Sequence, residues 1–244
     1  MFQAIFYALQ IAVALILPIV CLKKLGGNTK SAKKAFFQGI YAYLIFGALL
    51  SSVSESVVET SLPMLSPFRL NPWLSALLSG IVLTLCLSIG RAIWVKSALK
   101  KYNEKSDALS FGAGSAFAAT AIIYGLSGIV SFVFSIMKAV NSTKAVPVVF
   151  ESTAEIVAQG TAYTAFLSTL QALLICALEI CISAIFFTSL KKLSHKALVI
   201  PAIISFFAVH FFLRCPLGLE IRLIICAGIV LLTSGICWVC TKKK

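Results

Sequence analysis

Charged residues are scarce in this 244-residue chain: 12% of its residues are Asp, Glu, Lys or Arg, and eight of these are acidic. A typical soluble domain is about 25% charged and about 45–50% apolar. This sequence is 60% hydrophobic, and its mean hydropathy is +1.01. It therefore lacks the charged shell that keeps a buried apolar core in water, and a soluble globular fold is excluded.

The motifs of common soluble enzymes are also missing. The sequence has no phosphate-binding P-loop, no dinucleotide-binding fingerprint and no His-Glu-x-x-His zinc motif. Cys237 and Cys240 form a Cys-x-x-Cys pair, but no second pair lies in a polar segment, so the spacing does not predict a zinc site. We expect neither a metal nor another cofactor.

The formal net charge of +13 does not indicate a nucleic-acid partner. The Lys and Arg residues gather in short loops between apolar runs, as orientation signals of membrane proteins do. No basic face with interleaved aromatic residues follows from their positions, so nothing in the sequence would track a phosphate backbone.

The dominant feature of the sequence is a series of apolar runs of about 20 residues, the length that crosses a bilayer as a helix. We expect a single all-α transmembrane domain over residues 1–244, a polytopic helix bundle with two long polar connections near residues 54–72 and 138–160. The expected segments, about seven in number, lie at roughly Phe2–Leu22, Ala35–Val53, Trp73–Val95, Leu109–Met137, Thr161–Leu190, Ala197–Leu213 and Leu219–Cys240.

The distribution of basic residues predicts how this bundle is oriented. Sixteen of the 21 Lys and Arg residues lie in the loops after segments one, three and five and at the C-terminal end, when Arg91 is counted with the third segment's loop. By the positive-inside rule these loops are cytoplasmic, which puts the N-terminus outside and the C-terminus in the cytoplasm. We expect a multi-pass protein of a bacterial cell membrane, surrounded by the lipid bilayer.

Small residues are concentrated at the start of the fourth segment, in the stretch that contains Gly112, Gly114, Ser115 and Ala119. Side chains of this size let helices approach each other closely inside a membrane. We therefore expect this helix in the middle of the bundle, with the third segment as its neighbour.

Few ionisable side chains fall inside the apolar runs, and each one is a functional candidate because charge in hydrocarbon is costly. Glu179 is expected near the bilayer middle, Arg91 near the cytoplasmic end with its side chain reaching the surface, and His210 toward the outer end. Glu179 could be a proton carrier, an ion ligand or a catalytic base. It could equally be a protonated acid bonded to a neighbouring helix.

The stretch IGRAIWVKSALKKYNEKSDALSFGAGSAFAATAII resembles the YhfC-like family of bacterial membrane proteins, which is grouped with glutamic-type intramembrane proteases of the CAAX-processing type. The resemblance is strongest over roughly Leu77–Met137. Family members carry paired glutamates and a Gly-Arg on one helix, then a basic loop, and a Gly-His-Gly-Gly motif on the next helix. The matching residues are Gly90, Arg91, Lys100, Lys101, Tyr102, Asp107, Ala108, Ser110, Phe111, Gly112 and Gly114.

At the positions that the resemblance implies are catalytic, this chain has other residue types. The paired glutamates fall at Leu87 and Ser88, the motif histidine at Ser115 and the glutamate after it at Ala119. The resemblance therefore implies a membrane bundle without the carboxylate and histidines that a protease of this type needs. The two histidines of later helices fall near Leu178 or Glu179 and near Ser205 or Phe206.

Three functions remain open from the sequence. The first is a non-catalytic, pseudoprotease member of this family that acts as a scaffold, a sensor or a subunit binding another membrane protein. The second is an active intramembrane protease with an atypical site. The third is a small transporter, or a component of a transport complex, that uses Glu179. The candidate intramembrane polar site consists of Glu179, His210, Arg91 and Ser115, and no catalytic residue is assigned.

Overall fold

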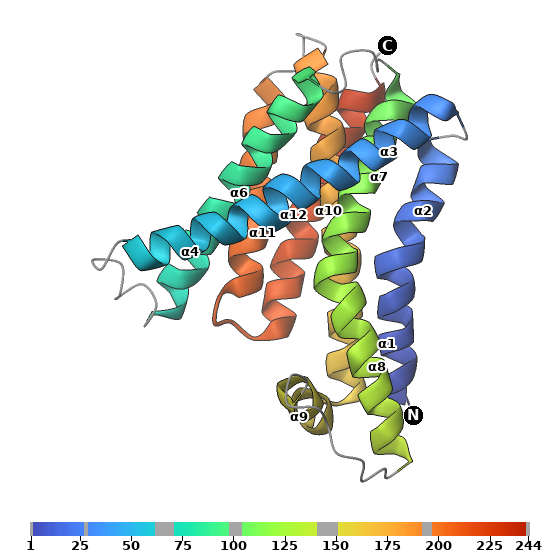
Figure 1. The fold of residues 1–244 in the computed structure, drawn as a ribbon, viewed down its shortest axis with the longest axis vertical. Helices are drawn as coiled ribbons and strands as arrows, with labels where there is room; N and C mark the ends of the chain where they lie inside the picture. The colour runs from blue at the N-terminus through green and yellow to red at the C-terminus, as the bar shows by residue number, and fades with distance from the viewer. Residues whose placement is uncertain are drawn as a thin grey trace.

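The computed structural model describes residues 2–26, 29–61, 71–97, 104–140, 151–191 and 197–242, and these residues form helices without any strand (Figure 1). Within them, six helical stretches are long and apolar enough to cross a membrane. A further apolar helix, Val199–Arg214, has 16 residues and is about 24 Å long, slightly shorter than a bilayer's hydrocarbon core. The predicted all-α polytopic membrane bundle is confirmed.

Several spans are built from joined α-helical and π-helical pieces. The first joins α1 (Phe2–Ile11), η1 (Ala12–Ile16), α2 (Leu17–Cys21) and η2 (Leu22–Gly26). The second joins α3 (Lys30–Ala42), η3 (Tyr43–Leu50) and α4 (Ser51–Ser61), and the fourth joins α7 (Lys105–Thr120), η5 (Ala121–Gly125) and α8 (Leu126–Ala139). The remaining helices are α6 (Pro72–Ser97), α9 (Glu151–Gln159), α10 (Ala162–Lys191), α11 (Val199–Arg214) and α12 (Leu219–Lys242).

Short polar side chains define where three of these helices begin. The Thr29 hydroxyl accepts a hydrogen bond from the first turn of α3, and the Asn71 side chain does the same for α6. Glu104 and Asp107 form a reciprocal capping box at the start of α7. These caps satisfy backbone N–H groups that a helix leaves without internal partners.

The π-helical turn η5 marks a polar connection between the first, fourth and fifth spans. The Tyr124 carbonyl in this turn accepts a hydrogen bond from Gln10 Nε2 at 2.9 Å, and the Gln10 Oε1 atom accepts one from the Ser168 hydroxyl at 2.9 Å. One buried amide side chain thus joins α1, η5 and α10.

Two glycines allow α7 to touch its neighbours backbone to backbone. A Cβ atom on Gly112 would lie 2.6 Å from the Ile180 carbonyl oxygen of α10, and one on Gly114 would collide with the Phe36 carbonyl of α3. The small residues at the start of the fourth segment therefore have the predicted role, because they permit close helix crossings on two sides.

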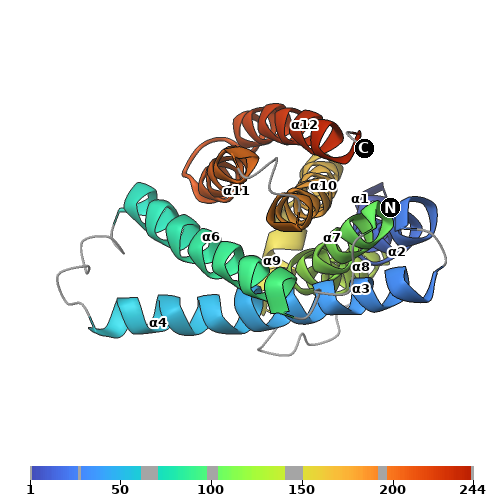
Figure 2. The ribbon, with the colours of Figure 1, turned by 90° about the horizontal axis from the view of Figure 1, so that it is seen from above.

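The centre of the bundle, however, is α10 rather than α7. In the most apolar 18-residue window of α10, 72% of the residues are buried, whereas no other span exceeds 39%. The first half of the fourth span, α7, is enclosed, but its second half, α8, leaves Leu126 and Val133 exposed. Seen from above, α10 lies among α6, α7, α11 and α12 (Figure 2).

The polar connection near residues 138–160 contains a helix that the sequence analysis did not predict, α9. Lys138 at the end of α8 donates hydrogen bonds to the Val157 and Ala158 carbonyls, and Gln3 of α1 donates a further one to Val157. These bonds hold the C-terminal end of α9 against the bundle.

The two ends of the described chain lie at opposite ends of the bundle (Figure 1), as an odd number of crossings requires. The expectation that the third and fourth segments are neighbours is not met along their length. In the view from above, α6 and α7 diverge, and both pack against α3 and α10 (Figure 2). The orientation relative to the cytoplasm remains a prediction.

Candidate functional site

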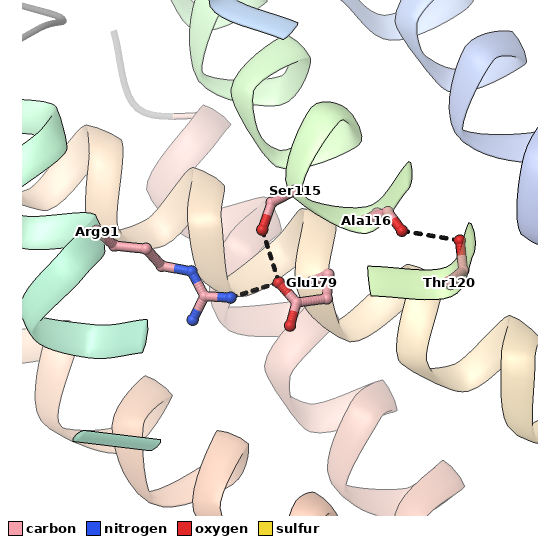
Figure 3. A network of polar contacts seen from close by, with 5 residues as sticks. All are labelled: Arg91, Ser115, Ala116, Thr120 and Glu179. Carbon is pink, nitrogen blue, oxygen red and sulfur yellow. Dashed lines mark hydrogen bonds and ion pairs between the residues drawn. The ribbon is translucent and has the colours of Figure 1, made fainter. Parts of the chain in front are cut away.

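The centre of the bundle holds a buried ion pair. Glu179 of α10 is 0% exposed, and its Oε2 atom accepts a charge-assisted hydrogen bond from Arg91 Nη2 of α6 (Figure 3). The same oxygen accepts a hydrogen bond of 2.9 Å from the Ser115 hydroxyl of α7. Three helices thus contribute one polar side chain each to a single carboxylate.

Close helix packing positions two of these side chains. The contact between Gly112 and the Ile180 backbone brings α7 against α10, and it carries Ser115 to the carboxylate one turn further along. On α6, Gly90 faces Phe46 of η3, while Arg91, the next residue, points toward Glu179 of α10 (Figure 3). A glycine at each crossing leaves room for the neighbouring polar residue to reach the centre.

The expectation that the Arg91 side chain reaches the cytoplasmic surface is wrong. The side chain is 2% exposed, and the guanidinium lies 4.7 Å from the centre of the Phe206 ring of α11. Long helical side chains point back toward the N-terminal end of their helix, which here is the direction of the bundle's middle. The Glu179 charge and the Phe206 ring both stabilise the guanidinium there.

His210 lies one aromatic ring away from the ion pair. Its ring contacts Phe206 edge-on, with 4.4 Å between the ring centres, and it is 6% exposed. No hydrogen bond among the described residues joins His210 to Glu179 or Ser115, and its Nε2 atom has no partner there. The structure therefore brings Glu179, Arg91 and Ser115 together and leaves His210 adjacent.

The positions that correspond to the family's acids are buried and mostly apolar. Leu87 is 1% exposed and Ala119 0%, and both belong to the main hydrophobic cluster. Ser88 is 7% exposed, and its hydroxyl has no hydrogen-bond partner among the described residues. None of these three side chains can act as a carboxylate base.

Three buried residues on the helices that meet at the ion pair were not predicted from the sequence to belong to the site. Phe206 stacks on Arg91, and it is apolar, so no pattern of charge would have singled it out. Thr84 and Ser183 are buried hydroxyl residues without a hydrogen-bond partner in the described part of the chain. Their signal was available, because helical spacing puts Thr84 on the face of Arg91 and Ser183 on the face of Glu179.

The chemistry of this arrangement follows from how the carboxylate is used. A general base must be free to take a proton from water or substrate. The Oε2 atom of Glu179 already accepts two hydrogen bonds, one of them from a guanidinium, whereas its Oε1 atom has no partner among the described residues. The opposite charges of Arg91 and Glu179 offset each other, so the pair adds little net charge to the bundle and joins α6 to α10.

Fold and site together define a class: a polytopic α-helical membrane protein with an Arg–Glu ion pair buried at the centre of its bundle. The family model described as YhfC intramembrane metalloprotease matches residues 11–222, and the chain belongs to this family. No curated protein and no solved structure matches the chain.

The family's description implies a catalytic metal, and the residues present at the centre do not fit one. Zinc sites of enzymes use three protein ligands from His, Asp, Glu or Cys. Among the described residues, no three such side chains gather in a way that could hold a metal ion. The single carboxylate there is paired with Arg91, whose positive charge would repel a cation bound to the same group.

Proposed function

We propose that this chain is a non-catalytic member of the YhfC family that serves as a scaffold, a sensor or a partner-binding subunit in the membrane. The observation that carries the proposal is the state of Glu179, the one carboxylate found at the centre of the described bundle. It is fully buried and is engaged by Arg91 and Ser115. Both contacts are to its Oε2 atom, and no second acid among the described residues lies beside it to form the pair of carboxylates that the resemblance implies for the family.

The replaced motif positions support the same conclusion. The resemblance assigns the family's acids to Leu87, Ser88 and Ala119 and its motif histidine to Ser115. A methyl or isobutyl group neither accepts a proton nor stabilises an oxyanion, and a serine hydroxyl does so poorly without a base beside it. The residues that shape the bundle, such as Gly90 and Gly112, are retained and make close helix contacts.

The decisive experiment measures peptide cleavage in the membrane. The purified protein is reconstituted into vesicles with a fluorogenic transmembrane peptide, beside a family member that keeps the paired glutamates as the positive control. We expect no cleavage above that of empty vesicles. Cleavage by this chain that is abolished by Glu179→Gln or Ser115→Ala, and not by Glu155→Gln at an exposed site on α9, would contradict the proposal.

The partner-binding part of the proposal has its own test. The chain is isolated from native membranes in a mild detergent, and the mass of the intact complex is measured. We expect another integral membrane protein in fixed, near-equimolar ratio. A particle that contains this chain and lipid alone would argue against partner binding while leaving the absence of catalysis intact.

One observation favours the transport alternative enough to keep it as a second candidate. Buried polar atoms without partners among the described residues occur on both helices that supply the ion pair, α6 and α10. A transporter that uses Glu179 needs a polar path to this carboxyl group. An atypical protease gains no comparable support, since His210 contacts Phe206 and makes no described hydrogen bond to Glu179 or Ser115.

A further inference from the structure

Buried polar atoms without hydrogen-bond partners are concentrated at one place in the described bundle. Most of them belong to α6, α10 and α11, three helices that pack against one another in all three pairs. Ser189 lies on a different face of α10 from Glu179, and we call the other residues of this group the polar seam: Thr84, Ser88, Arg91, Glu179, Ser183 and His210.

Within α6 and within α10, the seam residues fall on one helix face. On α6, Thr84, Ser88 and Arg91 follow each other at intervals of four and three residues, which places them on one helix face. On α10, Ser183 lies one turn from Glu179 in the same way. His210 is on the face of α11 that also presents Phe206 to Arg91.

Some of these groups cannot satisfy themselves by a small rotation. A serine or threonine hydroxyl in a helix can turn to the carbonyl four residues earlier. Arg91 Nε and Nη1, Glu179 Oε1 and His210 Nε2 have no such local acceptor or donor, and their side chains are at most 6% exposed. An unsatisfied polar group in a membrane interior costs several kcal/mol, so these atoms need a partner that is not another side chain.

From this geometry we infer that the polar seam binds a chain of water molecules that connects the Arg91–Glu179 pair with His210. The chemistry of the free atoms selects water. Arg91 offers hydrogen-bond donors, Glu179 Oε1 is an acceptor, and the hydroxyls can be either. Water both donates and accepts hydrogen bonds, so it can bond to each of these atoms. The opposite charges of Arg91 and Glu179 offset each other, so the seam has no net charge to recruit an ion.

The dimensions of the seam fit a short file of waters. Thr84 and Arg91 are seven residues apart, which is about 10 Å along α6. Waters in a hydrogen-bonded row are spaced about 2.8 Å apart, so about three or four would fill this length. The row runs from the middle of the bundle toward the end where α11 finishes at Arg214.

Aromatic side chains cover that end of the seam. Trp73 at the start of α6 lies next to Phe211 near the end of α11, with 6.4 Å between the ring centres. A Cβ atom on Gly80 would lie 3.3 Å from the Phe207 ring. Because the seam residue Thr84 lies toward this end of α6, we place the exchange of water with the outside past Phe211, and this path would give Glu179 a route for protons.

The first test measures thiol accessibility in membranes. Ser88→Cys and, as its matched control, the neighbouring buried Leu87→Cys are treated with a small methanethiosulfonate, and modified peptides are quantified by mass spectrometry. Because the reactive thiolate forms in contact with water, we expect Ser88→Cys to react about tenfold faster or more, with native Cys176 and Cys226 as unreactive references. Equal rates for Ser88→Cys and Leu87→Cys would overturn the inference.

The same measurement locates the entrance. Adding Phe211→Ala to Ser88→Cys should raise the rate of modification by a membrane-impermeant reagent applied on the side where α11 ends. An unchanged rate from that side, with the Ser88→Cys protein correctly folded, would show that the row of water does not open past Phe211 and would refute this route.

A second measurement needs no substitution and remains decisive if a cysteine variant does not fold. Radiolytic footprinting of the unaltered protein oxidises side chains that lie next to bound water. We expect oxidation of the seam residue His210 and of Phe206, whose ring contacts both His210 and Arg91, and none at Phe111 and Phe186, which are buried to a similar degree. Equal oxidation of all four would contradict bound water in the seam. Neither result depends on whether the protein cleaves peptides.

Discussion

At the scale of single residues, the stability of the bundle's centre depends on two opposite charges that compensate each other. Arg91 and Glu179 are both almost fully removed from solvent, and the two residues are 88 positions apart in sequence. Removing one partner leaves the other charge buried and unpaired, which typically costs about 3–5 kcal/mol. We therefore expect Glu179→Gln to lower the free energy of unfolding by about this amount, as measured by equilibrium unfolding in mixed micelles.

The matched control removes both charges together. In Arg91→Met/Glu179→Met no uncompensated charge remains, and replacement of a buried ion pair by apolar residues is often neutral or stabilising. We expect the double variant to recover most of the stability that Glu179→Gln loses. A double variant that is no more stable than the single one would mean that the pair is not the source of the loss.

The members of this site were predictable from the sequence, but their contacts were not. Glu179 and Arg91 stood out because ionisable residues inside apolar runs are rare, and Ser115 stood out because the resemblance places the motif histidine there. The depth of the Arg91 guanidinium in the bundle depends on the direction of the side chain. A long side chain on a helix points toward the helix N-terminus. Phe206 was noted only as one of two positions for a family histidine, and nothing in the sequence predicted its contact with Arg91.

At the scale of helices, the crossing of α3 and α7 depends on the absence of side chains. A Cβ atom on Gly114 would collide with the Phe36 backbone carbonyl, and backbone cannot move aside as a flexible side chain can. We expect Gly114→Ala to separate these helices and to cost about 1–3 kcal/mol, the range typical of overpacked interiors. Thermal unfolding in detergent measures the loss.

A second glycine provides the comparison. A Cβ atom on Gly228 of α12 would have no atom within 4 Å, and Ala is favoured over Gly in a helix by about 0.5–1 kcal/mol. Gly228→Ala should therefore leave the melting temperature unchanged or raise it slightly. If both variants behaved alike, the close approach of α3 and α7 would not be what Gly114 is needed for.

The attachment of α9 can be tested through Lys138. Its ammonium group donates hydrogen bonds of 2.7 and 3.4 Å to the last carbonyls of α9, where a helix lacks internal partners. Hydrogen bonds to charged groups contribute about 1.5–3 kcal/mol, so Lys138→Met should speed amide hydrogen exchange in α9 about tenfold or more. Lys96→Met, at an exposed position at the end of α6, should leave this exchange unchanged. Equal exchange in both variants would exclude the proposed attachment.

The membrane-spanning helices were predicted well from the sequence, and the polar helix α9 was not. Runs of about 20 apolar residues have one stable arrangement in a bilayer, because every backbone polar group must be satisfied within the segment. Residues 151–159 have no such constraint, and their helix is held by Lys138 and Gln3 from distant parts of the chain. Tertiary contacts of this kind leave no local pattern in the sequence.

At the scale of the whole molecule, the same physical rule explains why the bundle was predictable and its centre was not. Apolar length defines which segments cross, whereas the choice of a central helix depends on how all of them pack. The small residues of α7 correctly indicated close crossings, yet α10, with larger side chains, is the most enclosed helix. How deeply a helix is enclosed is a property of the assembled bundle, and it cannot be predicted from the sequence of one segment.

The buried position of Arg91 also bears on how the molecule is oriented. This residue is paired inside the bundle and so does not act as a cytoplasmic signal, but the exposed Lys residues at the ends of the spans still do. Lys23, Lys24, Lys33 and Lys34 cluster around the connection between η2 and α3, at the end of the bundle opposite the N-terminus. Under the positive-inside rule this end faces the cytoplasm.

Cysteine labelling from each side of the membrane checks this orientation. Lys33→Cys and Glu155→Cys are exposed at opposite ends of the bundle, whereas the native cysteines are buried or partly buried. We expect an impermeant maleimide to label Lys33→Cys in inverted vesicles and Glu155→Cys in right-side-out vesicles. The reversed pattern would put the lysine-rich end outside the cell, and the direction in which the polar seam opens would be reversed with it.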